Sequence, residues 1–386
     1  MSPQSMIALH AVEGPSAWSG ADMARRDHWK RRLTPPQIAE LDAALAAVEA
    51  RGLGLLDIRR EDFPLPALRP LLDEIGEELE SGCGVIRLSG LPVERWSEDQ
   101  AWIVFWGLSR HLGLPVHQNP VGRLIGWVRD ESASGASYVG QRNTLASDGG
   151  GTLTNQARVS SSGPLRFHTD LCDVVGLLCL RPAAEGGASR IASSQAIFNA
   201  MLRQRPDLAA VLSEPLHFCR PEGHADADGN RIYYQPVWGL ADGRFASAYS
   251  PVRVEMAQDA PGVPRLTALQ KEALQMLHRL QDEMSFAMDF AAGDIQFLNS
   301  HVTYHGRTAF RDDPAAGGRL LYRLWLATPD RSRPLPPGFA VEWGETAAGA
   351  LRGGIRRRHL PADLASLVSP AWQAAVARLR GQPDMP

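Results

Sequence analysis

Three residues with metal-binding side chains are spaced so that they could meet at one ion. His168 and Asp170 stand two positions apart, and in an extended segment residues two apart point to the same side. A second histidine, His305, comes much later, just after the strand-like run 293–299. Two histidines and one carboxylate on one face of an octahedral ion leave three positions open, as in non-haem Fe(II) oxygenases. A structural zinc site would instead be closed by four ligands, usually including cysteine.

An arginine supplies the next element of the pattern. Arg319 opens the strand-like segment 319–325, shortly after His305. Its guanidinium is a rigid fork of donors that can clamp a carboxylate through two hydrogen bonds. This position predicts that Arg319 binds the far carboxylate of 2-oxoglutarate. Arg323, four residues on, alternates to the same face of the strand.

Two nearby residues could compete for the ligand roles. Asp173 stands five positions after His168 and points to the opposite side if the strand is regular. His301 stands four positions before His305 and could share its face. We expect His301 to support a ligand or to pack against it rather than to bind the metal.

Together these pieces resemble the TauD/TfdA family of Fe(II)- and 2-oxoglutarate-dependent dioxygenases, which includes the clavaminate-synthase-like enzymes. The resemblance extends over about residues 163–329. Its matching pieces are FHTD at 167–170, the turn EGGAS at 185–189, GDIQFLNSHVTYHGRTAF at 293–310 and RLLYRLW at 319–325.

The resemblance implies a fold and a set of site residues. The fold is α+β with a mostly β core, a double-stranded β-helix (jelly roll, cupin-like), with packed helices and a helical N-terminal extension. Iron would be held by His168, Asp170 and His305. Arg319 would bind the C5 carboxylate of 2-oxoglutarate, with the Ser189 hydroxyl as helper, although the usual GGDT turn reads Gly-Gly-Ala-Ser here.

The resemblance also implies a reaction. O2 and 2-oxoglutarate would be consumed, succinate and CO2 released, and an unactivated C–H bond of a small anionic or amino-acid-derived molecule hydroxylated. Halogenating relatives lack the carboxylate ligand that Asp170 supplies here. Desaturation, cyclisation and other rearrangements stay open, as does a metal-binding jelly-roll protein without 2-oxoglutarate turnover.

The substrate class rests on two further arginines. Arg323 corresponds to a position that contacts an anionic substrate in some relatives and supports the co-substrate in others, and both roles stay open. Arg323 and Arg307 near the iron favour an anionic substrate, because a buried arginine needs a counter-charge.

The remaining sequence must position these residues. Apolar spacing and cap residues predict helices at 35–51, 68–82 and 98–112, and a strand at 85–88. Later segments predict strands at 173–180, 190–192, 244–249, 294–298 and 320–327, helices at 194–202 and 267–288, and a tail helix with Ser369 as its N-cap.

This reading divides the chain into four parts around one catalytic domain. Residues 1–130 are a helical N-terminal elaboration packed on the core, and 164–330 are the jelly-roll core with insertions. Residues 131–163 are rich in Gly, Ser, Thr and Asn, and a loop of that length before the chemical motif predicts a mobile active-site loop. Residues 331–386 are a tail with one helix.

Composition excludes several function classes. The 386 residues carry 40 basic and 43 acidic side chains, a formal net charge of −3, and 44% of them are apolar. This balance fits a globular protein and favours neither nucleic acid nor a membrane surface as partner, while a homo-oligomer stays open. The small-molecule substrate is what the family resemblance implies. Four cysteines without CxxC spacing and no apolar run of membrane-spanning length predict buried free thiols and a cytoplasmic location.

Overall fold

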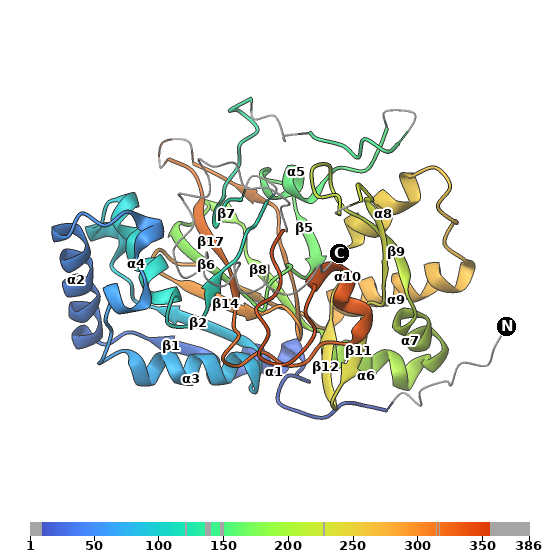
Figure 1. Ribbon diagram of the computed structural model, residues 1–386, viewed down its shortest axis with the longest axis horizontal. Coiled ribbons are helices and arrows are strands. Elements are labelled where there is room, and N and C mark those ends of the chain that lie inside the picture. Colours follow the sequence, from blue (N-terminus) through green and yellow to red (C-terminus); the bar gives the residue numbers. More distant parts are fainter. Residues whose placement is uncertain are drawn as a thin grey trace.

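The computed structural model describes residues 10–119, 122–135, 140–146, 150–226, 228–313, 315 and 317–355. Two β-sheets occupy the centre of the molecule, and helices gather at the two ends of its long axis (Figure 1). At one end lie α2 (Pro35–Ala50), α3 (Arg69–Glu80) and α4 (Glu98–Ser109). At the other lie α6 (Ser194–Gln204), α7 (Pro206–Ser213), α8 (Pro251–Asp259) and α9 (Ala268–Met284).

The larger sheet has seven strands, and all its pairings are antiparallel except that of β1 with β2. Its order is β1 (Lys30–Arg32), β2 (Val85–Ser89), β14 (Ile295–Asn299), β6 (Val174–Arg181), β17 (Leu320–Ala327) and β3 (Leu114–Pro115), with β4 (Ile125–Val128) also paired to β17. The smaller, antiparallel sheet has the order β13 (Phe286–Met288), β8 (Ser189–Ser193), β15 (Thr303–Arg307) and β5 (Leu165–His168).

Short elements complete the described part of the chain. Three two-stranded ladders pair β9 (Leu216–Cys219) with β10 (Ile232–Gln235), β11 (Trp238–Ala241) with β12 (Arg244–Ser247), and β7 (Glu185–Gly186) with β16 (Phe310–Arg311). The remaining helical elements are α1 (Gly20–Arg25), α5 (Asn155–Val159), α10 (Ala340–Trp343) and the 3₁₀ turns Leu55–Asp57, Arg60–Asp62, Val93–Arg95 and Pro337–Phe339.

Alternation along β17 shows how the core is divided. Leu320, Tyr322 and Leu324 join the core formed with α2, α3 and α4, and Tyr322 stacks on Trp102 of α4 at 3.8 Å between ring centroids. Trp325, on the other face, packs in a cluster that contains side chains of the smaller sheet. The face of β17 that carries Arg323 and Trp325 is therefore turned toward the interior between the two sheets.

Most predicted elements are present, and one is wrong in extent. The predicted helix 267–288 ends at Met284, and Phe286–Met288 forms β13 instead. Pairing with β8, where Phe286 lies opposite Ile191, overrides the helical pattern of these last residues. Leu269 near the start of this helix is 41% exposed, and the buried residues of the helix begin at Ala273.

The proposed division of the chain stays a prediction. Residues 1–130 contribute strands β1 to β4 to the larger sheet as well as helices, and α5 lies within 131–163. The predicted tail helix beginning at Ser369 lies outside the described residues.

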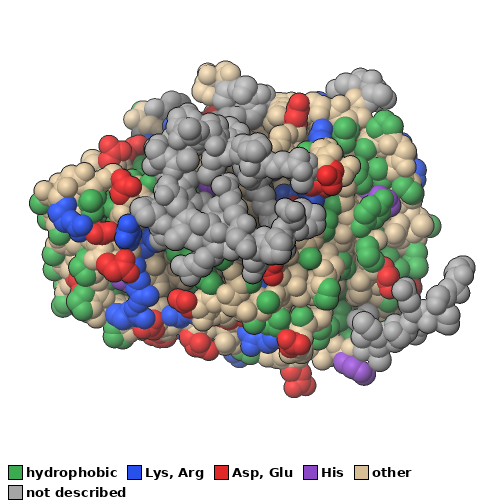
Figure 2. All heavy atoms as spheres, viewed as in Figure 1, with side chains coloured by type: hydrophobic (Ala, Val, Ile, Leu, Met, Phe, Trp, Pro, Cys, Tyr) green, Lys and Arg blue, Asp and Glu red, His purple; other side chains and the backbone are tan. Residues whose placement is uncertain are grey.

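The surface and the cysteines agree with the sequence pattern. Figure 2 shows acidic and basic side chains interspersed over the end of the molecule formed by α2 and α3. The four cysteines are buried and unpaired, which confirms the expected free thiols. In the part of the chain that the structure describes, no helix combines the length and apolar character needed to cross a bilayer.

Candidate active site

The three residues predicted to bind metal lie together. His168 ends β5, His305 lies in β15, and the two are direct partners in the antiparallel pairing, with ring centroids 4.3 Å apart. Asp170 lies beyond the end of β5 rather than within the strand, and its carboxylate oxygens are 3.6 Å from Nε2 of each histidine. The candidate ligand atoms all lie within 4.8 Å of one another, so one ion could contact all three buried side chains.

The protonation states suit a metal. Burial is the main cause that lowers the pKa of His305 to about 3, so its ring is neutral at pH 7. Burial by itself would raise the pKa of Asp170, but the neighbouring imidazoles and the positive charge of Arg323 hold it below its usual value. Metal ligands must be neutral imidazoles and ionised carboxylates, and this pocket favours those forms.

Two hydrogen bonds fix the orientation of these ligands. Nδ1 of His168 lies 2.9 Å from the carbonyl oxygen of Arg166. Because a carbonyl can only accept, Nδ1 carries the proton and the lone pair of Nε2 faces Asp170. Trp325 donates from Nε1 to the carboxylate of Asp170 at 3.0 Å. The sequence pattern did not single out Trp325 for this role, although it stands two residues after Arg323 on the same face of β17.

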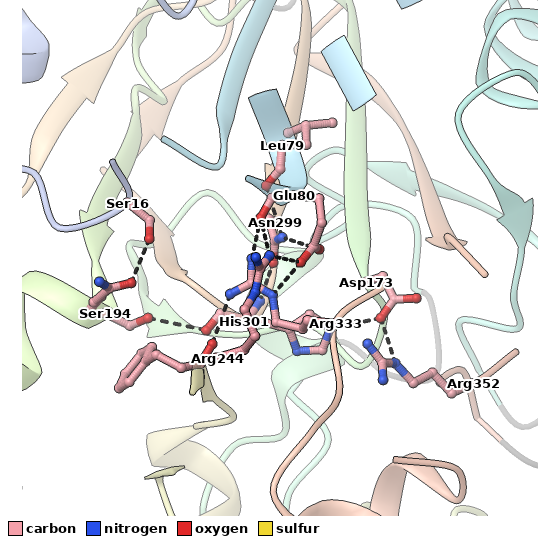
Figure 3. A network of polar contacts seen from close by, with 12 residues as sticks. Ser16, Leu79, Glu80, Asp173, Ser194, Arg244, Asn299, His301, Arg333 and Arg352 are labelled. Carbon is pink, nitrogen blue, oxygen red and sulfur yellow. Dashed lines mark hydrogen bonds and ion pairs between the residues drawn. The ribbon is translucent and has the colours of Figure 1, made fainter. Parts of the chain in front are cut away.

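The loop that carries Asp170 is anchored by Asp173. The Asp173 carboxylate accepts hydrogen bonds from His301 and Arg352, both at 2.8 Å, and from the backbone N–H of Thr328 at 2.9 Å. Figure 3 shows Arg352 and His301 converging on this carboxylate. Burial lowers the pKa of His301 to about 4, so Asp173 and Arg352 form the charged pair and a neutral His301 donates.

Arg319 is buried, and part of its guanidinium has no partner among the described residues. Its backbone N–H donates to Asp312 at 2.9 Å, and Nη2 lies 3.5 Å from the carbonyl oxygen of Gly187. Nη1 has no hydrogen-bond acceptor in the described part of the chain. Burial lowers the pKa of Arg319 to about 10, which still leaves it charged at pH 7. A buried cation with a free donor suits a carboxylate ligand such as that of 2-oxoglutarate.

A glycine turn brings β8 close to this arginine. Gly186 and Gly187 have φ values of +70° and +73°, which side chains rarely adopt. A Cβ at Gly186 would lie 2.2 Å from the carbonyl oxygen of Ala309, and one at Gly187 would lie 3.1 Å from Nε of Arg319. Ser189, which follows the turn, is buried, and its hydroxyl is 3.0–3.1 Å from the side-chain amide of Gln296.

Arg323 lies between the metal-binding group and β4. Its Nε donates to Oε1 of Gln118 at 2.7 Å, and its guanidinium lies 5.3 Å from the ring centroid of Trp325. Gln118 is held in turn by the carbonyl oxygens of Leu124 and Arg323. The described residues include no carboxylate in an ion pair with Arg323. Gln118 had no motif around it that could have revealed this contact.

A narrow cleft of about 30 Å³ borders Asp170. Arg253 and Glu342 line it as a buried ion pair, and Arg220 donates to the second oxygen of Glu342 at 2.6 Å. Gln235 also lines the cleft, and its Oε1 has no hydrogen-bond donor among the described residues. Sequence reasoning missed this group, since its members come from separate segments with no shared motif.

Comparison with known proteins decides the family. The family model described as "Taurine catabolism dioxygenase TauD, TfdA family" matches residues 49–325. The chain belongs to the TauD/TfdA family. It is 30% identical over 338 residues to the taurine hydroxylase-like protein SAT17 of Stachybotrys chartarum, covering 84% of this chain and 82% of the relative. It is 27% identical over 352 residues to FR-33289 synthase of Streptomyces rubellomurinus, covering 89% and 98%.

Solved structures share the TauD/TfdA fold. Asparagine oxygenase with Fe(II), hydroxyasparagine and succinate superimposes with a TM-score of 0.58 at 19% identity, covering 79% of this chain and 96% of that one. The oxygenase OrfP with Fe and alpha-ketoglutaric acid gives a TM-score of 0.56 at 17% identity, covering 78% and 94%. Family membership makes the chain a dioxygenase that uses iron and 2-oxoglutarate.

The anchor of the Asp170 loop can be tested by stability. We expect Asp173→Asn to lower the free energy of unfolding by about 3–5 kcal/mol, because it leaves the buried Arg352 charge without its partner. The matched control is Glu185→Gln, which removes the exposed ion pair with Arg311 and should cost less than about 1 kcal/mol. Urea unfolding gives the free energy of unfolding of both variants. Equal losses in the two variants would contradict the conclusion that Asp173 anchors the loop.

The same variant has a defined pH dependence. Although burial would raise the pKa of Asp173, its hydrogen bond with His301 and the charge of Arg352 hold that pKa below the usual value of about 3.9. A carboxyl group whose pKa is lowered by folding stabilises the fold at pH values above its pKa in the unfolded chain. This stabilisation is lost as the pH falls through the pKa of the folded state. The stability difference between wild type and Asp173→Asn should therefore be full at pH 7 and narrow below about pH 4.

Proposed function

We propose that this protein hydroxylates an unactivated C–H bond of a small anionic or amino-acid-derived molecule, releasing succinate and CO2. One observation carries the proposal. A buried group of two histidines and one carboxylate is accompanied by Arg319, a buried guanidinium with an unsatisfied donor that contacts the turn before β8, the strand paired with β15. Three ligands leave room for a chelating 2-oxo acid and O2, and the guanidinium suits the second carboxylate of that acid.

We infer that the two sheets form a double-stranded β-helix. The support is the order in which the chain visits them. Strands β4, β6, β14 and β17 lie in the larger sheet, while β5, β8, β13 and β15 lie in the smaller one. From β4 to β8 and again from β13 to β17, successive strands of these two sets change sheet, as expected when a long hairpin is rolled into two facing sheets.

In this proposed function each site residue has a defined role. His168, Asp170 and His305 hold Fe(II). Arg319 binds the C5 carboxylate of 2-oxoglutarate, and the Ser189 hydroxyl assists from the neighbouring strand. When bound, iron and 2-oxoglutarate together activate O2 and oxidise a C–H bond of the substrate.

The protein's own contribution is placement and exclusion of water. Trp325 keeps the Asp170 carboxylate oriented, and the Arg166 carbonyl keeps Nε2 of His168 free for the metal. All three ligands are at least nine-tenths buried, so a reacting C–H bond is kept away from bulk water. The substrate's orientation then decides which C–H bond reacts.

Arg323 supports an anionic substrate. Its guanidinium is close enough to the metal-binding group to act on the pKa of Asp170, yet it has a neutral partner in Gln118 and no ion pair among the described residues. One relative is named for taurine, an amino sulfonate, and asparagine oxygenase has been solved with a hydroxylated amino acid. Desaturation or cyclisation would begin with the same C–H cleavage, and product analysis separates these outcomes from hydroxylation.

Alanine variants test the metal site. We expect His168→Ala and His305→Ala to lose more than about 100-fold in succinate release, since even residues that only support a metal ligand contribute about 10–100-fold. Equilibrium dialysis under nitrogen should show that both variants also lose Fe(II) binding. His217→Ala is the matched control, because His217 packs against the exposed Tyr234 in the ladder of β9 with β10. Near wild-type succinate release in His168→Ala and His305→Ala would contradict the proposed site.

A substrate screen tests the role of Arg323. Among amino acids, sulfonates, phosphates and organic acids, we expect anionic compounds to stimulate succinate release most. Arg323→Gln should weaken that stimulation by about 10-fold or more, the value of a charged hydrogen bond, while the KM for 2-oxoglutarate stays within about twofold. A raised KM for 2-oxoglutarate with unchanged substrate stimulation would assign Arg323 to the co-substrate instead.

A further inference from the structure

A second buried arginine, Arg307, lies close enough to Arg319 for their charges to interact. The sequence associated it only with an anionic substrate, and the structure indicates a different ligand. Arg307 is the last residue of β15, two positions after His305, and both residues are buried. The guanidinium groups of Arg307 and Arg319 lie 4.7 Å and 5.2 Å from the ring centroid of the same residue, Phe310. Two like charges therefore lie against one phenyl ring in the interior.

Neither guanidinium is neutralised by the described residues. Nε and Nη1 of Arg307, and Nη1 of Arg319, have no hydrogen-bond acceptor among them, and neither arginine forms an ion pair with a described carboxylate. Asp130 and Asp312 are the acidic groups whose charges act on Arg307, and both already accept other hydrogen bonds. Two buried cations without an ion-paired carboxylate are costly, so the arrangement calls for an anion that is not part of the protein.

The strand register brings Arg307 to the predicted co-substrate pocket. Arg307 is the direct partner of Ser189 in the pairing of β15 with β8. Ser189 follows the turn whose Gly187 carbonyl contacts Arg319. Arg307, Ser189 and Arg319 therefore come from three different strands or strand ends and surround one region.

We propose that Arg307 is a second cationic ligand for the distal carboxylate of 2-oxoglutarate, which would be held between Arg307 and Arg319. The inference rests on the function proposed above. A carboxylate has four lone-pair directions, enough for two guanidinium groups. The three unpartnered guanidinium nitrogens are the donors that such a carboxylate would satisfy.

Arg307 also connects this pocket to the segment that leads into β5. Its Nη2 donates to the carbonyl oxygens of Ser161 and Gly163, both at 2.6 Å. Gly163 is followed within five residues by His168. One face of the guanidinium thus holds the start of the metal-binding strand, and its other donors are left for the co-substrate.

Calorimetric titration of the anaerobic Fe(II) protein tests the proposal without turnover. The two ligands are 2-oxoglutarate and 2-oxopentanoate, a 2-oxo acid of equal chain length without the distal carboxylate. We expect Arg307→Gln to raise the Kd of 2-oxoglutarate by about 10- to 100-fold, the value of one or two charged hydrogen bonds. The Kd of 2-oxopentanoate should change by less than about twofold, because that ligand never meets Arg307.

Controls separate the proposal from a structural role. Arg311→Gln, the same change in an exposed arginine paired with Glu185, should leave both Kd values unchanged, and Arg307→Lys should be intermediate. The role of Arg307 would be overturned if Arg307→Gln kept the wild-type Kd for 2-oxoglutarate. It would also be overturned if this change raised the Kd of both ligands by the same factor. Wild-type protein that binds the two acids equally would instead overturn the proposed function.

Discussion

The antiparallel pairing of β15 with β5 is the constraint on which the site depends. It places His305 opposite His168, although the whole of β6 to β14 lies between them in the chain. Side chains alternate along a strand, so a one-residue slip would turn His305 away from the interior. The same strand pairs on its other edge with β8, which brings Arg307 opposite Ser189. One strand thus carries a candidate metal ligand and a candidate anion-binding residue on a common face.

Unpaired positive charge is the second organising feature. The protein neutralises buried arginines elsewhere: Arg352 pairs with Asp173, Arg333 with Glu80, and Arg220 with Glu342. Arg307 and Arg319 have no such partner among the described residues, although both are buried. Two adjacent buried cations without an ion-paired carboxylate carry a cost that a dicarboxylate ligand held between them would remove on binding. The proposal therefore links affinity for 2-oxoglutarate to the stability of the protein.

The site was more predictable than its surroundings. His168, Asp170, His305 and Arg319 stand in local motifs whose residue types carry their own chemistry, so the sequence could single them out. The predicted end of α9 was wrong because the pairing of Phe286 with Ile191 is a long-range contact that the local sequence does not reveal. The Asp173–Arg352 pair and the Arg253–Glu342 pair join distant segments and could not be read from spacing. The alternation of side chains along a strand places Arg307 on the same face as His305. That Arg307 lacks an ion pair among the described residues is known only from the structure.

The central claim is that the two histidines, Asp170 and Arg319 form one site for Fe(II) and 2-oxoglutarate. Anaerobic titration of the Fe(II) protein with 2-oxoglutarate, followed by visible absorption, tests it most directly. A weak charge-transfer band should grow to saturation at one equivalent, because a 2-oxo acid chelated to the iron produces it. Arg319→Gln should require at least about 10-fold more 2-oxoglutarate to reach the same band. No band in the wild-type protein, or the same titration curve in Arg319→Gln, would contradict the account.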